Sequence, residues 1–218
     1  MIPIAVFVKT PGLSPIKTRL AHEIGKEKAE SFYQVCCRWT QSAIDEAAKQ
    51  CALHPIWAVA ELEGAKSPLW GSFENIYQGE GNLGERLHFV HEQLIRRFGT
   101  AIVIGADSPE MDPNVIVSAA NYLLEGAQSC FVMGNTPDGG FYLFGSNRSL
   151  SKEMWTSISY SEDTTARQLR NVVSSLGTVV ELPPCADVDY LEDLQNVMTR
   201  LKISQPQKYS ELLGLQLI

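Results

Sequence analysis

Hydrophobic and polar positions follow two different periods along the chain. Residues 2–8 form a continuous apolar run rich in β-branched side chains, which is typical of a strand covered by helices on both faces. In residues 26–49, apolar side chains recur at helical spacing, which predicts an amphipathic helix. The two patterns alternate over the rest of the chain, so the sequence predicts an α/β fold with a mostly parallel sheet and helices on both faces.

Apolar runs and helical spacing also give the approximate limits of each element. The predicted strands are residues 2–8, 56–60, 75–78, 101–105, 129–133, 141–144 and 178–182. The predicted helices are residues 26–49, 83–98, 113–124, 162–174, 190–201 and 207–213. Ser161 is the expected N-cap of the helix over 162–174, because a serine oxygen can accept from the free amides of the first turn. A chain of this length can bury one core, and we expect a single domain over residues 1–218.

The net charge of −7 is unevenly distributed along the chain. An acidic protein lacks the basic surface that nucleic-acid binding requires, so we expect no nucleic-acid partner. Residues 1–28 nevertheless carry five cations against two acids. These cations are Lys9, Lys17, Arg19, Lys26 and Lys28. The imbalance predicts that an anion binds near the N-terminal end of the chain.

The lengths of the apolar stretches and the pattern of cysteines indicate in which cellular compartment the protein is expected. Runs such as residues 4–8 and 101–104 are far shorter than the ~20 residues that cross a bilayer, so no membrane span is expected. The five cysteines form an odd set without a Cys-x-x-Cys pair, which favours reduced thiols packed in a core over disulfides or zinc ligands. We therefore expect a cytoplasmic protein.

The first candidate for chemistry is the loop that follows the first predicted strand. It presents Lys9, Lys17 and Arg19, which can donate charge-assisted hydrogen bonds to phosphate oxygens. It is not a Walker P-loop, because Pro11 and Ile16 stand where that motif needs glycines. The alternative is that these cations are simply solvated.

The second candidate is a glycine-rich turn before the helix over 83–98. Gly79, Gly81 and Gly84 match the spacing of a dinucleotide fingerprint, but the preceding residues 73–78 are too polar for the buried first strand of such a unit. A turn of this kind can still bring a nucleotide base or a phosphate close to the backbone. The alternative is an ordinary turn from strand to helix.

Acidic residues after predicted strands are the third candidate. Asp107 follows the strand over 101–105, where a carboxylate can bind a hard cation such as Mg²⁺ or Mn²⁺, or can cap the next helix instead. Asp138 lies in an Asp-Gly pair that an ordinary hairpin turn also uses. Asp187 and Asp189 can likewise serve only as caps of the helix that follows them.

Two histidines on the helix over 83–98 have a spacing that can bind a metal. His88 and His91 are three residues apart, but neither a carboxylate nor a cysteine is assured as a third ligand. A solvated helix face is the favoured interpretation of this pair.

Taken together and in this order, these segments resemble the DUF2064 family of uncharacterised bacterial glycosyltransferase-like proteins. The resemblance covers about residues 3 to 200. The motifs that carry it are residues 8–12 with 17–20, 78–79 with 83–86, 105–109, 138–141, and 187–189 with 192–194. The family is part of the nucleotide-diphospho-sugar transferase superfamily and is similar to the molybdenum-cofactor and phospholactate nucleotidyltransferases. The resemblance therefore implies a GT-A fold.

The resemblance also implies a role for each motif. The implied nucleotide-binding residues are Val8, Lys9, Thr10, Gly12, Lys17, Arg19, Leu83, Gly84, Glu85 and Arg86. Asp107 and Asp189 would ligate Mg²⁺ or Mn²⁺, and Asp107 would act in catalysis together with Lys17 and Arg19. The implied acceptor side is Asp138, Gly139 and Gly140.

The implied function is that of a transferase whose partners are a nucleotide or nucleotide-sugar and a small-molecule acceptor. We place first the transfer of a glycosyl group from a nucleotide-sugar. The alternative is nucleotidyl transfer, which joins a nucleoside triphosphate to a phosphorylated small molecule and releases pyrophosphate; a non-catalytic nucleotide-binding module is a further alternative. Phe141 stands where the family usually has Tyr, and Tyr160-Ser161-Glu162 where it often has Trp-Ser-Thr, so the acceptor preference is expected to differ.

Overall fold

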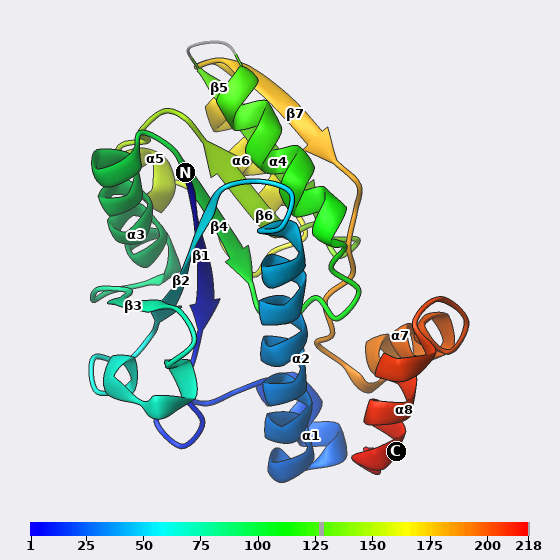
Figure 1. Cartoon of the computed structure of the whole chain (residues 1–218). Helices are drawn as coiled ribbons and strands as arrows, with labels where there is room; N and C mark the ends of the chain where they lie inside the picture. The colour runs from blue at the N-terminus through cyan, green and yellow to red at the C-terminus, as the bar shows by residue number, and fades with distance from the viewer. Residues whose placement is uncertain (127–128, 218) are drawn as a thin grey trace.

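A seven-stranded sheet forms the centre of the computed structural model, which describes residues 1–126 and 129–217. The strands lie in the order β3-β2-β1-β4-β6-β5-β7 (Figure 1). Their bounds are β1 (Ile2–Val8), β2 (Leu53–Val59), β3 (Glu74–Tyr77), β4 (Ala101–Gly105), β5 (Cys130–Asn135), β6 (Phe141–Ser146) and β7 (Thr178–Leu182). Val6 pairs with Trp57 on one side and Ile104 on the other, so β1 lies between two parallel neighbours. Helices cover both faces of β1, which explains its continuous apolar run.

Strand β6 runs against the rest of the sheet. It pairs antiparallel with both β4 and β5, whereas the pairs β1·β2, β1·β4, β2·β3 and β5·β7 are parallel. A hairpin turn over residues 136–140 joins β5 to β6, with the Thr136 amide donating to the Gly140 carbonyl at 2.9 Å. The predicted mostly parallel α/β sheet is confirmed, and the Asp-Gly pair does form a hairpin turn.

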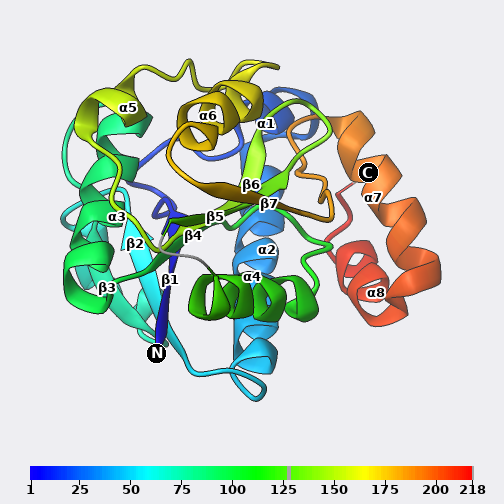
Figure 2. The same ribbon diagram turned by 90° about the horizontal axis from the view of Figure 1, so that it is seen from above.

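Helices pack on both faces of this sheet, as Figure 2 shows from above. Their bounds are α1 (Thr18–Ile24), α2 (Lys26–Ala47), α3 (Leu83–Phe98), α4 (Pro113–Glu125), α5 (Lys152–Thr156), α6 (Thr165–Ser174), α7 (Leu191–Ser204) and α8 (Pro206–Gly214). Helices α2 and α4 cover one face and α3, α5 and α6 the other. Two 3₁₀ turns, Gly64–Lys66 and Pro68–Trp70, lie between β2 and β3.

Alternate side chains of β1 fill the two hydrophobic cores. Ile4 and Val6 lie in the core under α2 and α4, whereas Ala5 lies in the core under α3, α5 and α6. A third cluster, which includes Phe32 and Leu194, joins α1, α2, α7 and α8. Burial of one large apolar side chain contributes about 1.5–3 kcal/mol. The strand ends are therefore firmly held, and the loops that follow them have fixed starting points.

The start of α6 differs from the prediction. The helix begins at Thr165 rather than at 162, and Ser161 is not its N-cap, because the backbone of Ser161 has a positive φ of 62°. The Thr165 hydroxyl donates to the Ser159 carbonyl at 2.8 Å, and its oxygen accepts from the Glu162 amide at 3.2 Å. These bonds hold residues 159–165 in a turn that a helix starting at 162 would break. The short helices α1 and α5 were also not predicted.

His91 is buried, so the predicted solvated face is wrong for this residue. Its Nε2 lies 2.7 Å from Ser146 Oγ, and the Ser146 hydroxyl donates to the Arg148 carbonyl at 2.7 Å. The Ser146 oxygen therefore accepts, and the His91 proton lies on Nε2. Burial lowers the pKa of His91 to about 3, so the imidazole is neutral at ordinary pH.

The cysteines can be compared with the predicted reduced thiols, and the helices with the length needed to cross a membrane. All five cysteines lie within the described residues and are free thiols, and Cys36, Cys37 and Cys130 are buried. This agrees with the expected packing role. No helix in the described part of the chain is long and apolar enough to cross a membrane.

Candidate functional site

A cavity of about 550 Å³ lies beside the carboxyl ends of β1, β4 and β5. In open α/β sheets this edge carries the ligand sites. One part of the lining is apolar and includes Phe7, Leu87 and Val103. The rest is strongly acidic. The carboxylates that line it are Asp107, Asp138, Glu162, Asp163, Asp187, Asp189 and Asp193.

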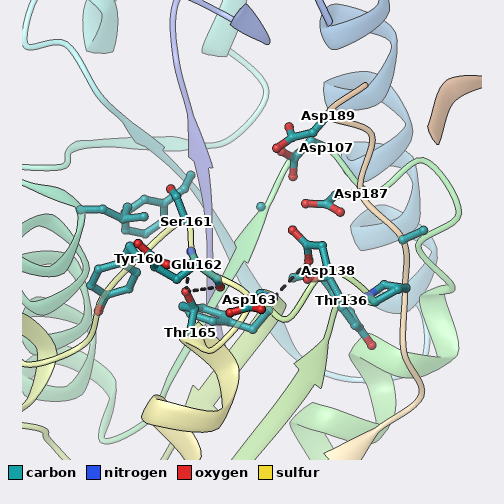
Figure 3. Close-up of a pocket in the computed structure, with 18 of the residues that line it drawn as sticks. Asp107, Thr136, Asp138, Tyr160, Ser161, Glu162, Asp163, Thr165, Asp187 and Asp189 are labelled. Carbon is teal, nitrogen blue, oxygen red and sulfur yellow. Dashed lines mark hydrogen bonds between the residues drawn. The ribbon is translucent and has the colours of Figure 1, made fainter. Parts of the chain in front are cut away.

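Four of these aspartates gather on one side of the cavity in Figure 3, where Asp189 and Asp107 lie side by side and Asp187 and Asp138 follow. They come from three separate parts of the chain, after β4, after β5 and after β7. The fold brings them together because the carboxyl ends of parallel strands share one edge of the sheet. Among the described residues that line the cavity, Arg19 is the only lysine or arginine.

Lys17 joins the first loop to two of these aspartates. Its Nζ donates to Asp107 Oδ2 at 2.8 Å and to Asp189 Oδ1 at 3.1 Å. Arg19 Nη1 donates to the other oxygen of Asp189 at 2.8 Å. The loop after β1 therefore delivers two positive charges to two acids that are 90 and 172 residues away from Lys17 in the sequence.

Local backbone geometry supports this arrangement. Lys17 has φ 43° and ψ 51°, the left-handed region that non-glycine residues rarely adopt, and it directly precedes α1. On the other side, a Cβ added to Gly105 would lie 2.7 Å from Asp107 Oδ1. Glycine at the end of β4 therefore leaves the space in which the Asp107 carboxylate lies.

Burial and charge act against each other in this ion pair. Burial would lower the pKa of the Lys17 amine, but the carboxylates of Asp107 and Asp189 outweigh it and hold that pKa above its usual value. Burial would likewise raise the pKa of Asp107, yet the charge and hydrogen bond of Lys17 hold it below its usual value. Lys17 is therefore charged and Asp107 ionised at neutral pH.

Asp187 shows that the acidic side is not fully neutralised. Burial, together with the nearby charges of Asp107 and Asp138, raises the pKa of Asp187 from 3.8 to about 7. Lys17 acts in the opposite direction but does not cancel these effects. The cluster thus retains excess negative charge and can accept a further cation.

Asp107 and Asp189 are the residues that could hold a divalent cation. Carboxylate oxygens are the ligands that Mg²⁺ and Mn²⁺ prefer, and Lys17 Nζ already lies within hydrogen-bond distance of one oxygen from each. A single positive centre can therefore contact both residues. Residues 1–126 and 129–217 contain no group of three or more His, Cys, Asp or Glu side chains arranged to hold a metal. The remaining ligands would be substrate phosphates and water, as is usual for Mg²⁺.

The hairpin over residues 136–140 forms the wall next to Asp187. Asp138 Oδ1 accepts from the Thr136 hydroxyl and from the Gly140 amide, the latter at 3.1 Å. Gly139 has φ 91°, and an added Cβ would lie 2.0 Å from the Asp163 carbonyl oxygen. Thr136, Asp138 and Gly140 line the cavity, whereas Gly139 packs against the neighbouring turn.

The turn over residues 159–165 forms the adjoining wall. Tyr160, Ser161, Glu162 and Asp163 line the cavity, and Tyr160 donates its hydroxyl to the Trp155 carbonyl at 2.9 Å. The Ala166 amide donates to the Gly139 carbonyl at 2.9 Å, which fixes this turn to the hairpin. The residues that depart from the family pattern at 160–162 therefore lie in the cavity wall, as does Phe141.

The turn before α3 contributes less to the cavity than the sequence suggested. Leu83 lines it, but Glu85 closes a capping box with Asn82 and pairs with Lys152 at 2.8 Å. Arg86 Nε donates to the Gly81 carbonyl at 3.0 Å. Gly84 is buried, and an added Cβ would lie 2.8 Å from the Trp155 carbonyl oxygen and 2.9 Å from the Tyr160 ring. β3 before this turn is an edge strand, unlike the first strand of a dinucleotide unit.

The first loop also places some predicted residues away from the cavity lining. The Val8 carbonyl accepts from the Ala60 amide, and Thr10 Oγ1 accepts from Trp70 Nε1 at 3.1 Å. Lys9 Nζ donates to the Pro15 carbonyl at 3.3 Å. Gly12 lines a different hollow, of about 440 Å³, bounded by this loop and α1.

Asp187 and Tyr190 line the cavity, although neither is among the predicted site residues. Tyr190 is about half exposed, lines the cavity, and lies under the Arg19 guanidinium, whose Cζ is 5.5 Å from the ring centroid. Asp187 was read as a possible cap together with Asp189, but it faces Asp107 and Asp138 (Figure 3). The repeated acidic spacing at 187 and 189 was the available signal for Asp187; nothing in the sequence singled out Tyr190.

Solved structures define the class of fold. A protein of Desulfovibrio desulfuricans G20 assigned to the nucleotide-diphospho-sugar transferases is 24% identical and has a TM-score of 0.81, over 97% of this chain and 93% of that one. A cytidylyltransferase from Leptospira borgpetersenii is 11% identical with a TM-score of 0.55, over 98% and 92%. Glucosyl-3-phosphoglycerate synthase from Mycobacterium tuberculosis, in complex with Mn²⁺, UDP and phosphoglyceric acid, is 12% identical with a TM-score of 0.51, over 92% and 77%. The chain has the nucleotide-diphospho-sugar transferase fold.

Within that class, the sequence identifies the family. Residues 42–162 match the family described as "uncharacterized protein conserved in bacteria (DUF2064)", and this stretch is more than half of the chain. The protein belongs to the DUF2064 family, as the resemblance predicted. Asp107 and Asp138 fall within the matched residues, whereas Lys17, Arg19 and Asp189 lie outside them. No curated protein matches the chain.

Proposed function

We propose that the protein transfers a glycosyl group from a nucleotide-sugar, with the help of Mg²⁺ or Mn²⁺, to a hydroxyl of a small acceptor that carries no phosphate. The fold and the position of the cavity support a donor that is a nucleotide or nucleotide-sugar. The acidic lining of the proposed acceptor half supports glycosyl transfer over nucleotidyl transfer. Asp138, Glu162 and Asp163 line that half.

The donor half of the cavity would lie around Lys17 and Arg19. These two cations would donate charge-assisted hydrogen bonds to the phosphates of the donor. They would then offset the negative charge that develops on the departing nucleoside diphosphate. Bound Mg²⁺ or Mn²⁺, held by Asp107 and Asp189, would supply further positive charge to the same phosphates.

The apolar part of the cavity fits a flat ring. Phe7, Leu83, Leu87 and Phe141 line this part. A nucleotide base or the face of a sugar can pack against such side chains, while the polar edge of the ring stays near the carboxylates. The cavity of about 550 Å³ lies in the size range of small-molecule sites.

The acceptor half favours hydroxyl groups over phosphates. A carboxylate accepts hydrogen bonds from a hydroxyl, but it repels a phosphate at short distance. Neither a lysine nor an arginine from the hairpin or from the turn over 159–165 lines the described cavity. A phosphorylated acceptor, which nucleotidyl transfer in its predicted form requires, would therefore meet uncompensated negative charge.

Nucleotidyl transfer remains the alternative, and the structure gives it less support than the sequence did. A triphosphate would suit a cluster of three cations, but Lys9 Nζ donates to the Pro15 carbonyl at 3.3 Å, and neither Lys9 nor Lys17 is among the residues that line the cavity. Two cations, Lys17 and Arg19, remain beside the aspartates. A non-catalytic nucleotide-binding module would leave the cluster of Asp107, Asp187 and Asp189 without a function.

A paired product assay tests the proposal. The full chain is incubated with Mn²⁺ and a panel of nucleotide-sugars or nucleoside triphosphates, with sugars and their phosphorylated counterparts as acceptors. We expect nucleoside diphosphate release with unphosphorylated acceptors, and at least a 100-fold lower rate in Asp107→Asn. Pyrophosphate release from a triphosphate would establish the alternative instead, and neither product with any donor would support the binding module.

The acceptor preference has its own matched variants. Asp138→Asn and Glu162→Gln keep the size of the side chain but remove a negative charge. If the acidic lining selects the acceptor, each change should narrow the difference in kcat/KM between a sugar and its phosphorylated counterpart. Glu192→Gln, on the first turn of α7 and outside the cavity lining, is the control. An unchanged ratio in both cavity variants would contradict the role of the carboxylates in acceptor choice.

A further inference from the structure

Lys17 takes the position that a cation shared by the two aspartates would take. Its Nζ lies 2.8 Å from Asp107 Oδ2 and 3.1 Å from Asp189 Oδ1, and its side chain is only 6% exposed. Each aspartate therefore offers the ammonium one oxygen, as each would to a shared metal ion. Two positive centres cannot occupy one position, so Lys17 and a divalent cation compete for it.

The backbone of Lys17 is held in a conformation that it would not choose alone. Among the described residues, positive φ outside glycine occurs at Lys17, Ser161 and Gln216. For a residue with a Cβ this region is unfavourable, and it persists where the surroundings impose it. The Lys17 carbonyl accepts from the Ala21 amide at 2.7 Å at the start of α1, while its ammonium makes the two ion pairs, so both the backbone and the side chain of this residue are held.

Asp189 keeps other contacts when the ammonium leaves, and Asp107 keeps the space that its carboxylate occupies. Asp189 Oδ2 accepts from Arg19 Nη1 at 2.8 Å, which does not depend on Lys17. The Asp189 amide also donates to Asp193 Oδ2 at 3.1 Å, at the start of α7. Asp107 Oδ1 lies over Gly105, where no side chain competes for the space. Both carboxylates can therefore stay in place for another cation.

We propose that Lys17 is a placeholder cation: it joins Asp107 to Asp189 in the donor-free protein and moves to the phosphates of the donor on binding, so that the metal enters only with the donor. This inference rests on the proposed function, because it assumes a metal-dependent donor. A lysine suits the task, since its flexible four-carbon stem carries three donors that phosphate oxygens accept. The donor-free protein then binds a divalent cation weakly.

Mn²⁺ binding by the donor-free full chain, followed by the electron paramagnetic resonance signal of free Mn²⁺, tests this order. Lys17→Met removes the charge and keeps a chain of similar length, so we expect the Kd for Mn²⁺ to fall at least tenfold. Lys202→Met, the same change at an exposed position on α7, should leave the Kd as in the wild type. Adding Asp107→Asn to Lys17→Met should abolish the gain.

The outcomes separate this proposal from the proposed function. A Kd for Mn²⁺ in Lys17→Met that equals the wild-type Kd would overturn the placeholder role. Lys17→Gln gives the same comparison if the methionine variant does not fold. Since the titration contains no donor, such a failure leaves sugar transfer untouched. Tightened Mn²⁺ binding in a protein that releases no product would count against the proposed function alone.

Discussion

The two loops that the sequence predicts to bind a nucleotide use their polar groups in different ways. The loop after β1 sends Lys17 and Arg19 to carboxylates 90 and 170 residues further along the chain. The turn before α3 bonds mostly to itself, because Glu85 caps its own helix through Asn82 and Arg86 donates to the Gly81 carbonyl; the further pair of Glu85 with Lys152 leads to α5 and not to the aspartates of the cavity. Motifs of similar residue types thus serve the site in one case and the local backbone in the other.

The difference follows from where the two loops lie in the sheet. β1 is central, between β2 and β4, so the residues after it lie next to the segment after β4 that carries Asp107. The chain after β7 brings Asp189 to the same place. β3 is an edge strand, and the turn after it has neighbours on one side only. Glu85 and Arg86 therefore find their partners in their own turn and on α5, and none among the aspartates of the cavity. The place of each loop in the sheet accounts for how its polar residues are used.

Activity should separate the loops most strongly. Lys17→Met is expected to lower kcat/KM for the donor by about 100- to 1,000-fold, because a charge next to the departing phosphate is lost. Arg86→Met, in the other loop, should change it by no more than about threefold, since Arg86 bonds to the Gly81 carbonyl. Steady-state kinetics on both variants measure the contrast. Equal losses would erase the distinction between the loops.

Acid should affect the α3 region through folding rather than through chemistry. The pKa of His91 in the folded chain is about 3, below its usual 6.5, so its contribution to stability is full above pH 6.5 and is lost as the pH falls toward 3. Linkage gives a loss of about 3 kcal/mol between pH 7 and pH 4. Urea unfolding should show a smaller loss in His91→Gln and no change from wild type in the exposed control His22→Gln. A wild-type pH dependence retained in His91→Gln would reject this source of acid sensitivity.

Close packing of the second loop is testable at one glycine. Gly84→Ala would place a Cβ 2.8 Å from the Trp155 carbonyl oxygen, and we expect a loss of about 2 kcal/mol in the free energy of unfolding. Gly214→Ala, where a Cβ would meet no atom within 4 Å, should cause no loss. Thermal unfolding of the two variants gives the comparison. If Gly84→Ala is as stable as the control, the packing at this turn is looser than the structure indicates.

The smallest effect is expected at the cap of α3. Glu85→Ala removes one half of the capping box and the ion pair with Lys152, which should lower the free energy of unfolding by less than Gly84→Ala does. Glu125→Ala, at the exposed end of α4, is the matched control. Nucleotide affinity, measured by calorimetry, should stay unchanged in both. Weaker nucleotide binding in Glu85→Ala, with stability unchanged, would show that Glu85 contributes to nucleotide binding.

Periodicity predicted regular elements well where one pattern dominates. The bounds of α3, β4 and β7 agree with the sequence prediction at both ends, because Asn82, Gly99 and the β-branched runs mark them clearly. The start of α6 was missed because the bonds of the Thr165 hydroxyl hold the preceding turn, which no propensity reveals. Helix α1 has seven residues and follows a left-handed Lys17, so it offers too short a pattern to detect.

The candidate site was predictable in kind but not in arrangement. Acids after strands and cations after β1 suggested which residue types would meet, since strand ends share one edge. The ion pairs of Lys17 depend on a sheet order that places β4 beside β1, which periodicity alone does not give. Tyr190 lines the cavity because of the path that the chain takes after β7. No pattern in the sequence predicts that path.

The reversed direction of β6 has a consequence for how such a protein can diversify. Because β6 runs back from the cavity edge, the chain visits that edge twice in a short span, at residues 136–140 and again at 159–165. The wall assigned to the acceptor thus comes from one contiguous stretch, while Lys17, Arg19, Asp107 and Asp189 come from elsewhere. Under the proposed function, substitutions within that stretch would change the acceptor and leave the residues proposed to bind the donor unchanged.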